Sequence, residues 1–413
     1  MSRHNTNKNS NNDVAFDVIS LSSYTSPEIV EVVNEDFVHY GEDNNYFQEI
    51  IEYYVGSPTN GSLINGISKL IYGKGISAID SAKKPEQYAK MLSMIKPRAL
   101  KRIILDRKML GMGAIQVTYD KGQPSKITHF PMNTLRAAKA NDAGEITSWG
   151  YSADWANVKK NDKIKTIPAF GHGNSKGNEI YIITDYVPGY FYYTPPDYVQ
   201  ALPYAKLEDE IGDYLVNDTV NGFSGTMMVN FNTGVPSAII QKETNAKLMR
   251  QLSGANGTKI MTSFNKPGQQ ATTMERFALD NAPDHYQYLS NECRDKLLMG
   301  HRISNPLLVG IKDGGSGLSN NSDEIETAFK LQNNTVIKPY QNEIIEALEE
   351  IFALSGITLQ IYFKSLQPLD FYEGEVIEEE VKEEEVIEEE AAEVVSEEIA
   401  QEDLEEDNNI EKI

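Results

Sequence analysis

Residues 283–321, PDHYQYLSNECRDKLLMGHRISNPLLVGIKDGGSGLSNN, join an amphipathic helical pattern to a loop rich in Gly, Ser and Asn. Apolar side chains recur every three or four residues, a spacing that gathers them on one face of a helix. Pro283 suits the first helical turn, where a missing N–H costs nothing. The stretch therefore predicts a helix at about Pro283–His301, then a loop, with an apolar face that includes Tyr286, Leu289, Cys293 and Leu297.

Two more long helices are predicted on either side of this stretch. The first covers about Asp197–Asn221 and repeats the same apolar spacing. The other begins at Ser322 or Asp323, either of which suits an N-cap, and Glu326 stands at capping-box distance from Asp323. Its apolar spacing continues past Pro339, which must kink or break the helix because it removes a backbone hydrogen bond and clashes with the preceding turn.

A small β-α-β-β unit is predicted between the first two of these helices. It reads as a strand at Met227–Phe231, a helix at about Gln241–Leu252, and strands near Lys259–Phe264 and Thr272–Phe277. Gly and Pro residues mark the turns between them. This plan of helix, insert, helix, loop and helix favours an assembled tube over a closed pocket.

The part of the chain before residue 195 mixes helical patterns with strand-like alternation. The predicted elements are a helix ending at Gly56, helices at about Ser62–Tyr72 and Pro85–Leu110, and strands at Ala114–Tyr119, Ile180–Asp185 and Ile357–Phe363. The last strand is expected to return and pair with the β-rich N-terminal domain. The predicted fold class is therefore α+β.

Charge is distributed unevenly along the 413 residues. The net charge is −23, but residues 373–413 hold 20 acidic residues against Lys382 and Lys412, so the rest of the chain carries only −5. Such a tail is typical of a solvated, disordered extension. The alternative is a helix with a weak apolar stripe that forms only by packing against its own copies or another chain.

The remaining composition argues for a globular protein without disulfides or membrane spans. Cys293 is the sole cysteine, and its place on an apolar stripe predicts a buried structural thiol in a reducing compartment. No stretch approaches 18 apolar residues, and residues 1–12 are polar and Asn-rich, which predicts a frayed N-terminus.

Enzyme signatures are absent from the sequence. No loop ends in Gly-Lys-Ser/Thr, no Gly-x-Ser-x-Gly motif occurs, and the six histidines stand singly. The pair Gly111 and Gly113 lacks the third glycine of a dinucleotide site. Acidic pairs such as Glu208 and Asp209 are expected on solvent faces. The sequence predicts no catalytic residue, no cofactor and no metal.

Basic residues are too scattered to predict firm nucleic-acid binding. The densest groups are Lys83-Lys84, Lys96–Arg107 and Lys159–Lys165, and each is interpreted as a solvated face. Neutralising phosphates takes clustered Lys and Arg. A chain of this charge that still handles DNA would contact it loosely and allow it to slide.

Several short motifs follow one another along the chain in an order that indicates a known family. They are Phe37–Asn44 (FVHYGEDN), Ser57–Ile67, Tyr72–Gly75, Lys108–Gln116 (KMLGMGAIQ), His129-Phe-Pro131, Tyr193–Tyr198 (YTPPDY), and Ile303–Gly310 followed by Gly314–Ser322 and a long helix bearing Pro339. In this order, over about residues 30–370, the sequence resembles the portal proteins of tailed bacteriophages, the head-tail connector family.

The resemblance implies a set of domains. They are a disordered N-terminus at 1–12, a wing at 13–195 and 356–372, a first stem helix at 197–222, a clip at 223–279, a second stem helix at 282–302, a tunnel loop at 304–322, a kinked long helix at 323–355, and a tail or crown at 373–413. The tunnel-loop residues expected to face DNA are Lys312, Asp313, Gly314, Ser316, Asn320 and Asn321. Pro306 and Gly310 would form the loop base and Pro339 the kink. The Glu-rich tail departs from the helical crown of the family.

The same resemblance implies a role in the virion. About twelve subunits would form a ring at one capsid vertex, with loose contact to double-stranded DNA in the channel during packaging and ejection. The expected partners are a terminase, a head-completion or adaptor protein, and the major capsid or scaffolding protein, without a membrane. The expected location is the portal vertex, and the host cytoplasm during assembly. The alternatives are another virion or scaffold protein with the same helical plan, or an enzyme whose site the sequence does not reveal.

Overall fold

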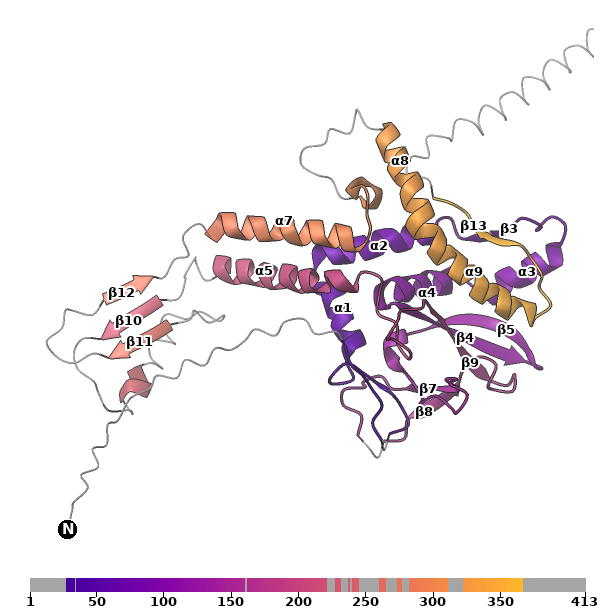
Figure 1. Cartoon of the computed structure of the whole chain (residues 1–413), viewed down its shortest axis with the longest axis horizontal. Coiled ribbons are helices and arrows are strands. Elements are labelled where there is room, and N and C mark those ends of the chain that lie inside the picture. The colour runs from indigo at the N-terminus through magenta and orange to yellow at the C-terminus, as the bar shows by residue number, and fades with distance from the viewer. Residues whose placement is uncertain are drawn as a thin grey trace, which may run out of the picture. The chain divides into compact units, whose positions relative to one another are not determined.

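The computed structural model describes residues 27–33, 35–159, 162–220, 227–231, 237, 240–244, 260–264, 273–276, 282–310 and 322–366 (Figure 1). Within these residues the fold is a mixture of helices and strands, as the sequence predicted. The expectations for residues 1–12 and for the acidic tail at 373–413 lie outside the described residues.

The N-terminal part begins with a short hairpin and four helices. Strands β1 (Ile29–Val30) and β2 (His39–Tyr40) pair antiparallel, and the helices are α1 (Tyr46–Gly56), α2 (Pro58–Tyr72), α3 (Pro85–Met94) and α4 (Pro97–Leu110). Helix α2 starts four residues before the predicted Ser62, because Ser57 caps it by accepting a hydrogen bond from the Asn60 N–H and Pro58 occupies the first turn.

The prediction of a single helix at Pro85–Leu110 was wrong, because the structure has two helices there. Ile95 and Lys96 are extended between α3 and α4, because Pro97 disfavours helical geometry in the residue before it and then opens a new helix. The break lets α4 change direction and pack against α2 and β4.

Two antiparallel sheets follow. In the first, β4 (Met112–Asp120) lies between β5 (Gln123–Phe130) and β9 (Asn178–Thr184). In the second, β7 (Ser148–Tyr151) lies between β6 (Leu135–Ala137) and β8 (Lys165–Pro168). A buried arginine joins this second sheet to the N-terminal segment, because Arg136 donates to the side chain and the backbone carbonyl of Asn44 at 2.6 Å each.

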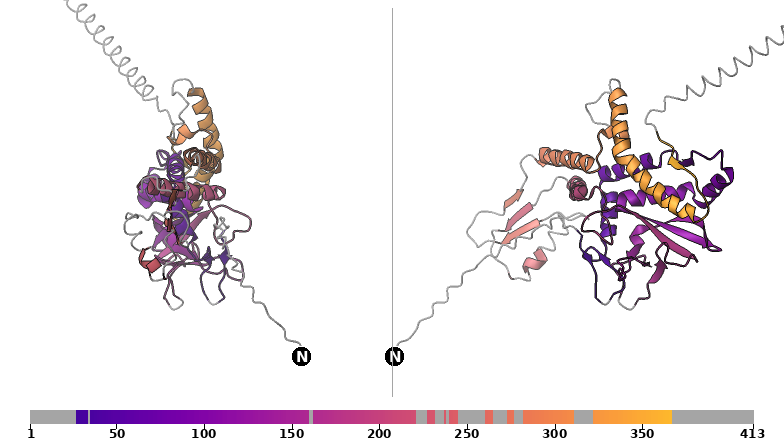
Figure 2. Two further views of the ribbon diagram at one scale, coloured as in Figure 1. Left: turned by 90° about the vertical axis from the view of Figure 1, so that its left-hand side faces the viewer. Right: turned by 45° about the vertical axis from the view of Figure 1, so that its right-hand side comes forward.

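The helix pair α5 (Leu202–Val220) and α7 (Ala282–Gly300) lies side by side (Figures 1 and 2). The rings of Tyr214 and Tyr286 stack across the pair with centroids 4.6 Å apart, and Cys293 is fully buried, as predicted. Helix α5 starts later than the predicted Asp197, because Val199–Ala201 forms a 3₁₀ turn first. At the base of the pair, a Cβ on Gly300 would lie 2.4 Å from the Ala201 Cβ, so only glycine permits this approach.

The predicted insert between α5 and α7 contains the expected three strands. Strand β10 (Met227–Phe231) is central, parallel to β11 (Ile260–Phe264) and antiparallel to β12 (Thr273–Arg276). Of the predicted Gln241–Leu252 helix, residues 241–244 are helical and the remainder lies outside the described residues.

The last long helix contains an irregular turn where Pro339 was expected to disturb it. Helix α8 (Ser322–Gln332) passes through a π-helical segment, Asn333–Ile337, into α9 (Lys338–Ala353). The wider turn comes just before the proline, where the ring would crowd an α-helical carbonyl. Strand β13 (Ile361–Phe363) then pairs antiparallel with β3 (Ile76–Ala78), which confirms the predicted return to the N-terminal region.

Helices α4 and α9 cover the same face of the first sheet. Asp106 of α4 contacts His129, and Glu350 of α9 accepts a hydrogen bond from Tyr181. His129 and Tyr181 both lie opposite Ile115 of the central strand, and directly opposed residues project from the same side of a sheet. Helix α4 therefore lies at the centre of the core, packed on the sheet and on α2 and joined to α9 by the ion pair of Arg107 with Glu343.

Replacing Gly111 with Ala should destabilise the fold more than the same change at Gly122. Both residues have φ near +80°, but a Cβ on Gly111 would lie 2.4 Å from the Thr194 carbonyl oxygen, whereas nothing lies within 4 Å at Gly122. We expect Gly122→Ala to cost about 1–2 kcal/mol from backbone strain. Gly111→Ala should cost about 1–3 kcal/mol more from overpacking, measured by denaturant unfolding. Equal losses would contradict this packing.

Candidate functional site: the helix junction

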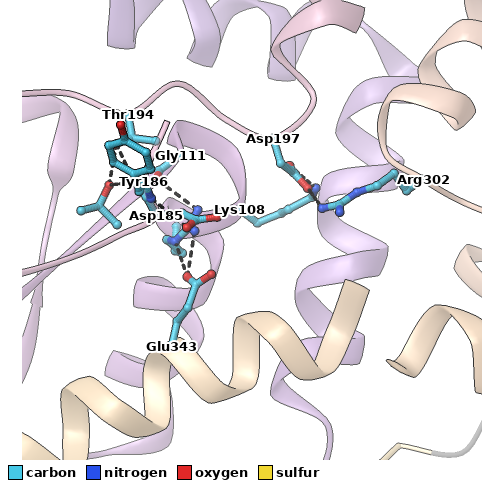
Figure 3. A network of polar contacts seen from close by, with 10 residues as sticks. Lys108, Gly111, Asp185, Tyr186, Thr194, Asp197, Arg302 and Glu343 are labelled. Atoms are coloured by element: carbon cyan, nitrogen blue, oxygen red, sulfur yellow. Dashed lines mark hydrogen bonds and ion pairs between the residues drawn. The ribbon is translucent and has the colours of Figure 1, made fainter. Parts of the chain in front are cut away.

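One carboxylate joins three segments of the chain at the place where α4, α5 and α7 meet. Asp197, just before α5, receives a hydrogen bond from Lys108 Nζ on its Oδ1 at 2.6 Å and from Arg302 Nη2 on its Oδ2 at 2.7 Å (Figure 3). Lys108 belongs to α4 and is fully buried, and Arg302 follows the end of α7. We call Lys108, Asp197, His301 and Arg302 the helix junction.

The electrostatics of the helix junction follow from burial. Desolvation lowers the pKa of Lys108, and the neighbouring Asp197 charge opposes that fall. Burial works to raise the pKa of Asp197, but Lys108 and Arg302 outweigh it and hold the value well below its usual range. The carboxylate therefore stays ionised, which is what keeps two cations in place around it.

His301 extends the junction toward α2. Its Nε2 lies 2.9 Å from Oδ1 of Asn60, and its ring stacks on Tyr198 with centroids 4.2 Å apart. Desolvation, followed by the positive charge of Lys108, sets the pKa of His301 well below its ordinary value. The imidazole is therefore neutral, and the amide oxygen of Asn60 accepts a proton carried on Nε2.

A second ion pair ties α4 to α9. Arg107 Nε and Nη2 lie 2.9 and 2.8 Å from Oε2 of Glu343, and Arg107 Nη1 donates to the Gly111 carbonyl at 3.0 Å (Figure 3). Burial raises the pKa of Glu343, while Arg107 works to lower it. Two consecutive basic residues of α4 thus reach different partners, one toward the helix pair and one toward α9.

The prediction that Glu208 and Asp209 lie on a solvent face was wrong. Glu208 accepts hydrogen bonds from the Thr59 hydroxyl at 2.6 Å, from the Thr59 N–H at 3.1 Å and from the Ser57 hydroxyl. A carboxylate at the N-terminus of α2 complements unpaired N–H groups and the helix dipole. Asp209 packs against Gly56, whose missing side chain leaves room for it.

The structure describes part of the predicted loop site. Lys312, Asp313, Gly314, Ser316, Asn320 and Asn321 lie outside the described residues. Pro306 opens a 3₁₀ turn (Pro306–Val309) capped by Asn305, and Gly310 ends it with φ of +80°. This loop base rests on α2, where a Cβ on Gly66 would lie 2.8 Å from Val309. Pro339 lies apart from it, in the first turn of α9.

The helix junction was missed by the sequence analysis, although one signal was present. Arg107 and Lys108 each lie four residues after a buried isoleucine of α4, Ile103 and Ile104. A cation on an apolar stripe needs a buried acidic partner, because an unpaired charge is costly in the interior. That signal predicts that Arg107 and Lys108 have acidic partners, but it does not identify which residues these are.

The described part of the chain shows neither a metal site nor a membrane-spanning helix. Among the described residues, no group of three or more His, Cys, Asp or Glu side chains is placed to hold a metal ion. Within those residues, no helix combines the length and apolar character needed to cross a membrane.

The chain matches no family model and no curated protein. Solved structures do match. A chain in the virion of a native gene transfer agent (GTA) particle aligns at 12% identity over 82% of this chain and 88% of its own, with a TM-score of 0.50. A chain in the neck of a native GTA particle, treated with C12 symmetry, aligns at 13% identity over 77% and 83%, also with a TM-score of 0.50.

A third match is weaker. An HK97-family phage portal protein from Corynebacterium diphtheriae aligns at 8% identity over 69% of this chain and 90% of its own, with a TM-score of 0.40, too low to support an inference. At such identities the GTA matches establish the fold alone. This chain has the fold of chains found in the virion and in the neck of GTA particles.

Removing the carboxylate of the helix junction should destabilise the protein strongly. Asp197→Asn leaves Lys108 charged and buried, and breaking a buried ion pair costs about 3–5 kcal/mol. Asp295→Asn is a matched control, because its pairing with Arg294 at 3.3 Å lies on the surface and is worth at most about 1 kcal/mol. Denaturant unfolding measures both, and similar losses would contradict the assigned role of Asp197.

Stability should also fall in mild acid because of His301. Its pKa is depressed in the folded state, so its contribution is complete above an unfolded value of about 6.5 and is lost as the pH falls below it. The loss should approach about 1.4 kcal/mol per pH unit for one group. We expect His301→Gln to remove this slope and the exposed His285→Gln to retain it. Identical pH profiles for wild type and His301→Gln would exclude the effect.

Proposed function

We propose that this chain is the subunit of a phage-type portal ring at one capsid vertex. The observation that carries the proposal is the shared fold with the GTA virion chain, because that alignment spans most of both chains. The ring would be the channel for DNA packaging and ejection. Catalysis is not part of the proposal, and ATP hydrolysis would belong to a partner terminase.

The domain assignment is also a proposal. Residues 13–195 and 356–372 would be the wing, α5 and α7 the stem, the β10–β12 unit the clip, and α8 with α9 the long helix that returns to the wing. The clip would bind a head-completion or adaptor protein. The loop at 304–322, held at its base by Pro306–Val309, would reach into the channel and contact DNA.

The helix pair has surface properties that suit a ring wall. Val216, Tyr288 and Met299 are 64%, 63% and 69% exposed in the single chain. Large apolar side chains exposed on neighbouring helices are typical of surfaces that another molecule covers. In a cyclic assembly each copy presents the same surface to its neighbour, so these side chains would be buried between copies.

The charge of the helix pair suits the passage of DNA. Helix α5 has Lys206 against five acidic residues, and α7 has three acidic residues against Arg294 and Lys296. Each firm phosphate contact adds affinity, and an acidic wall makes few of them. A duplex between such helices would slide and would not be held.

Electron microscopy of the purified full chain tests this proposal, with rings that have a central hole as the expected result. Tyr288→Glu should reduce the ring fraction, because it places a charge on the surface proposed to be covered. Ile79→Glu is the matched control, since Ile79 is 72% exposed and lies outside the helix pair. Mass photometry measures the assembly of each variant. Wild-type protein that remains monomeric or dimeric would refute the portal proposal.

A further inference from the structure

One exposed surface collects basic residues from four elements that are distant in sequence. Lys69 and Lys74 lie at and after the end of α2, Lys101 lies in α4, Lys338 begins α9 and Lys364 follows β13, and all five are exposed. We call these five residues the basic patch. We propose that the basic patch binds the phosphate backbone of double-stranded DNA, as a holding site separate from the helix pair.

Contacts within the fold bring these residues to one place. Lys101 Nζ lies 4.6 Å from the centre of the Tyr72 ring, and Lys69 is three residues before Tyr72 on the same helical face. The backbones of Lys74 and Lys364 are joined, because the Lys74 N–H donates to the Lys364 carbonyl at 2.9 Å.

Lys338 is brought in by the start of α9. Three residues later, Gln341 Nε2 donates to the Ile71 carbonyl at 2.8 Å, at the end of α2. Residues three apart in a helix are neighbours on its surface. The end of α2 is therefore the centre around which all five lysines gather.

The segments that form the patch contribute no negative charge. Residues 58–79, 95–105, 333–342 and 351–366 contain no Asp or Glu. Three of the carboxylates next to these segments have partners of their own, since Asp80 pairs with Lys84, Asp106 with His129, and Glu343 with Arg107. A local positive potential therefore persists in a chain of net charge −23.

The residues of the Lys96–Arg107 group, predicted to form a solvated face, have two different environments. Arg107, like the adjacent Lys108, is buried and forms an ion pair with an acidic residue of the fold. Lys101 points outward and joins the patch, and Arg98 and Arg102 are exposed beside it on α4. The basic residues at the end of α4 therefore stabilise the fold, and those at its beginning are exposed to a ligand.

A polyanion with regularly spaced charges fits these features best. Duplex DNA gains affinity by releasing counterions when several lysines neutralise successive phosphates. The ring under Lys101 holds that amine near the surface, which reduces its freedom before binding. The patch contrasts with the acidic helix pair, so one chain would combine a sliding surface with a holding one.

The experiment uses the full chain and a fluorescent duplex of about 30 base pairs, with anisotropy measured over a range of salt concentrations. Lys69→Gln, Lys101→Gln and Lys364→Gln are combined in one variant. Losing three phosphate contacts should lower the slope of log affinity against log salt by about 2–3 and weaken binding about tenfold or more at low salt. The control combines Lys121→Gln, Lys126→Gln and Lys176→Gln, which are exposed and change the net charge equally.

The proposal is supported if the patch variant loses binding and the control variant binds as the wild type does. It is overturned if both variants weaken equally, or if the wild type does not bind the duplex at low salt. It is also overturned if poly-glutamate binds through the same lysines and DNA does not, since the partner would then be an acidic protein. Mass photometry of the same samples reports ring formation separately, so failure of the patch and failure of the portal proposal are distinguishable.

Discussion

The orientation of the helix pair depends on one ionised carboxylate. Among the described residues, Asp197 is the acidic partner of Lys108, and it also pairs with Arg302, which follows the end of α7 at the same base of the pair. Without it, a buried ammonium group would face the interior unpaired, and the segments that lead into α5 and out of α7 would lose their common anchor. The apolar contacts between α5 and α7 hold the two helices to each other, whereas this charge fixes both of them to α4.

Helix α4 accordingly connects the first sheet, the helix pair and α9. It packs on the first sheet, carries Lys108 toward the helix pair and directs Arg107 toward α9. Its exposed beginning contributes Lys101 to the basic patch. In the proposed ring, these ion pairs are one route by which a force on the stem would reach the wing and the long helix, beside the hydrogen bonds from Glu208 and His301 to α2.

Patterns of short range were predictable from the sequence, and pairings of long range were not. The strands of the insert and the buried Cys293 followed from local alternation and helical spacing. The break at Pro97 was missed although the proline was visible, because one continuous basic and apolar pattern crosses it. Asp197 lies 89 residues from Lys108 and 105 from Arg302, and no local pattern relates positions so far apart. Glu208 was misplaced for the same reason, since its partners are about 150 residues away.

The π-helical turn at Asn333–Ile337 acts as a phase shift between α8 and α9. Counting back from the buried Tyr340 at ordinary helical spacing would bury residues 333, 329 and 326, yet Gln332 is buried, residue 333 is only half-buried and residue 326 is exposed. The buried stripe of α8 is therefore displaced by one residue, about 100° of rotation. One residue more or fewer here would change the length of the helix by only about 1.5 Å while turning a whole face of α8 away from its neighbours. The number of residues in this segment is thus constrained by rotation and not by distance.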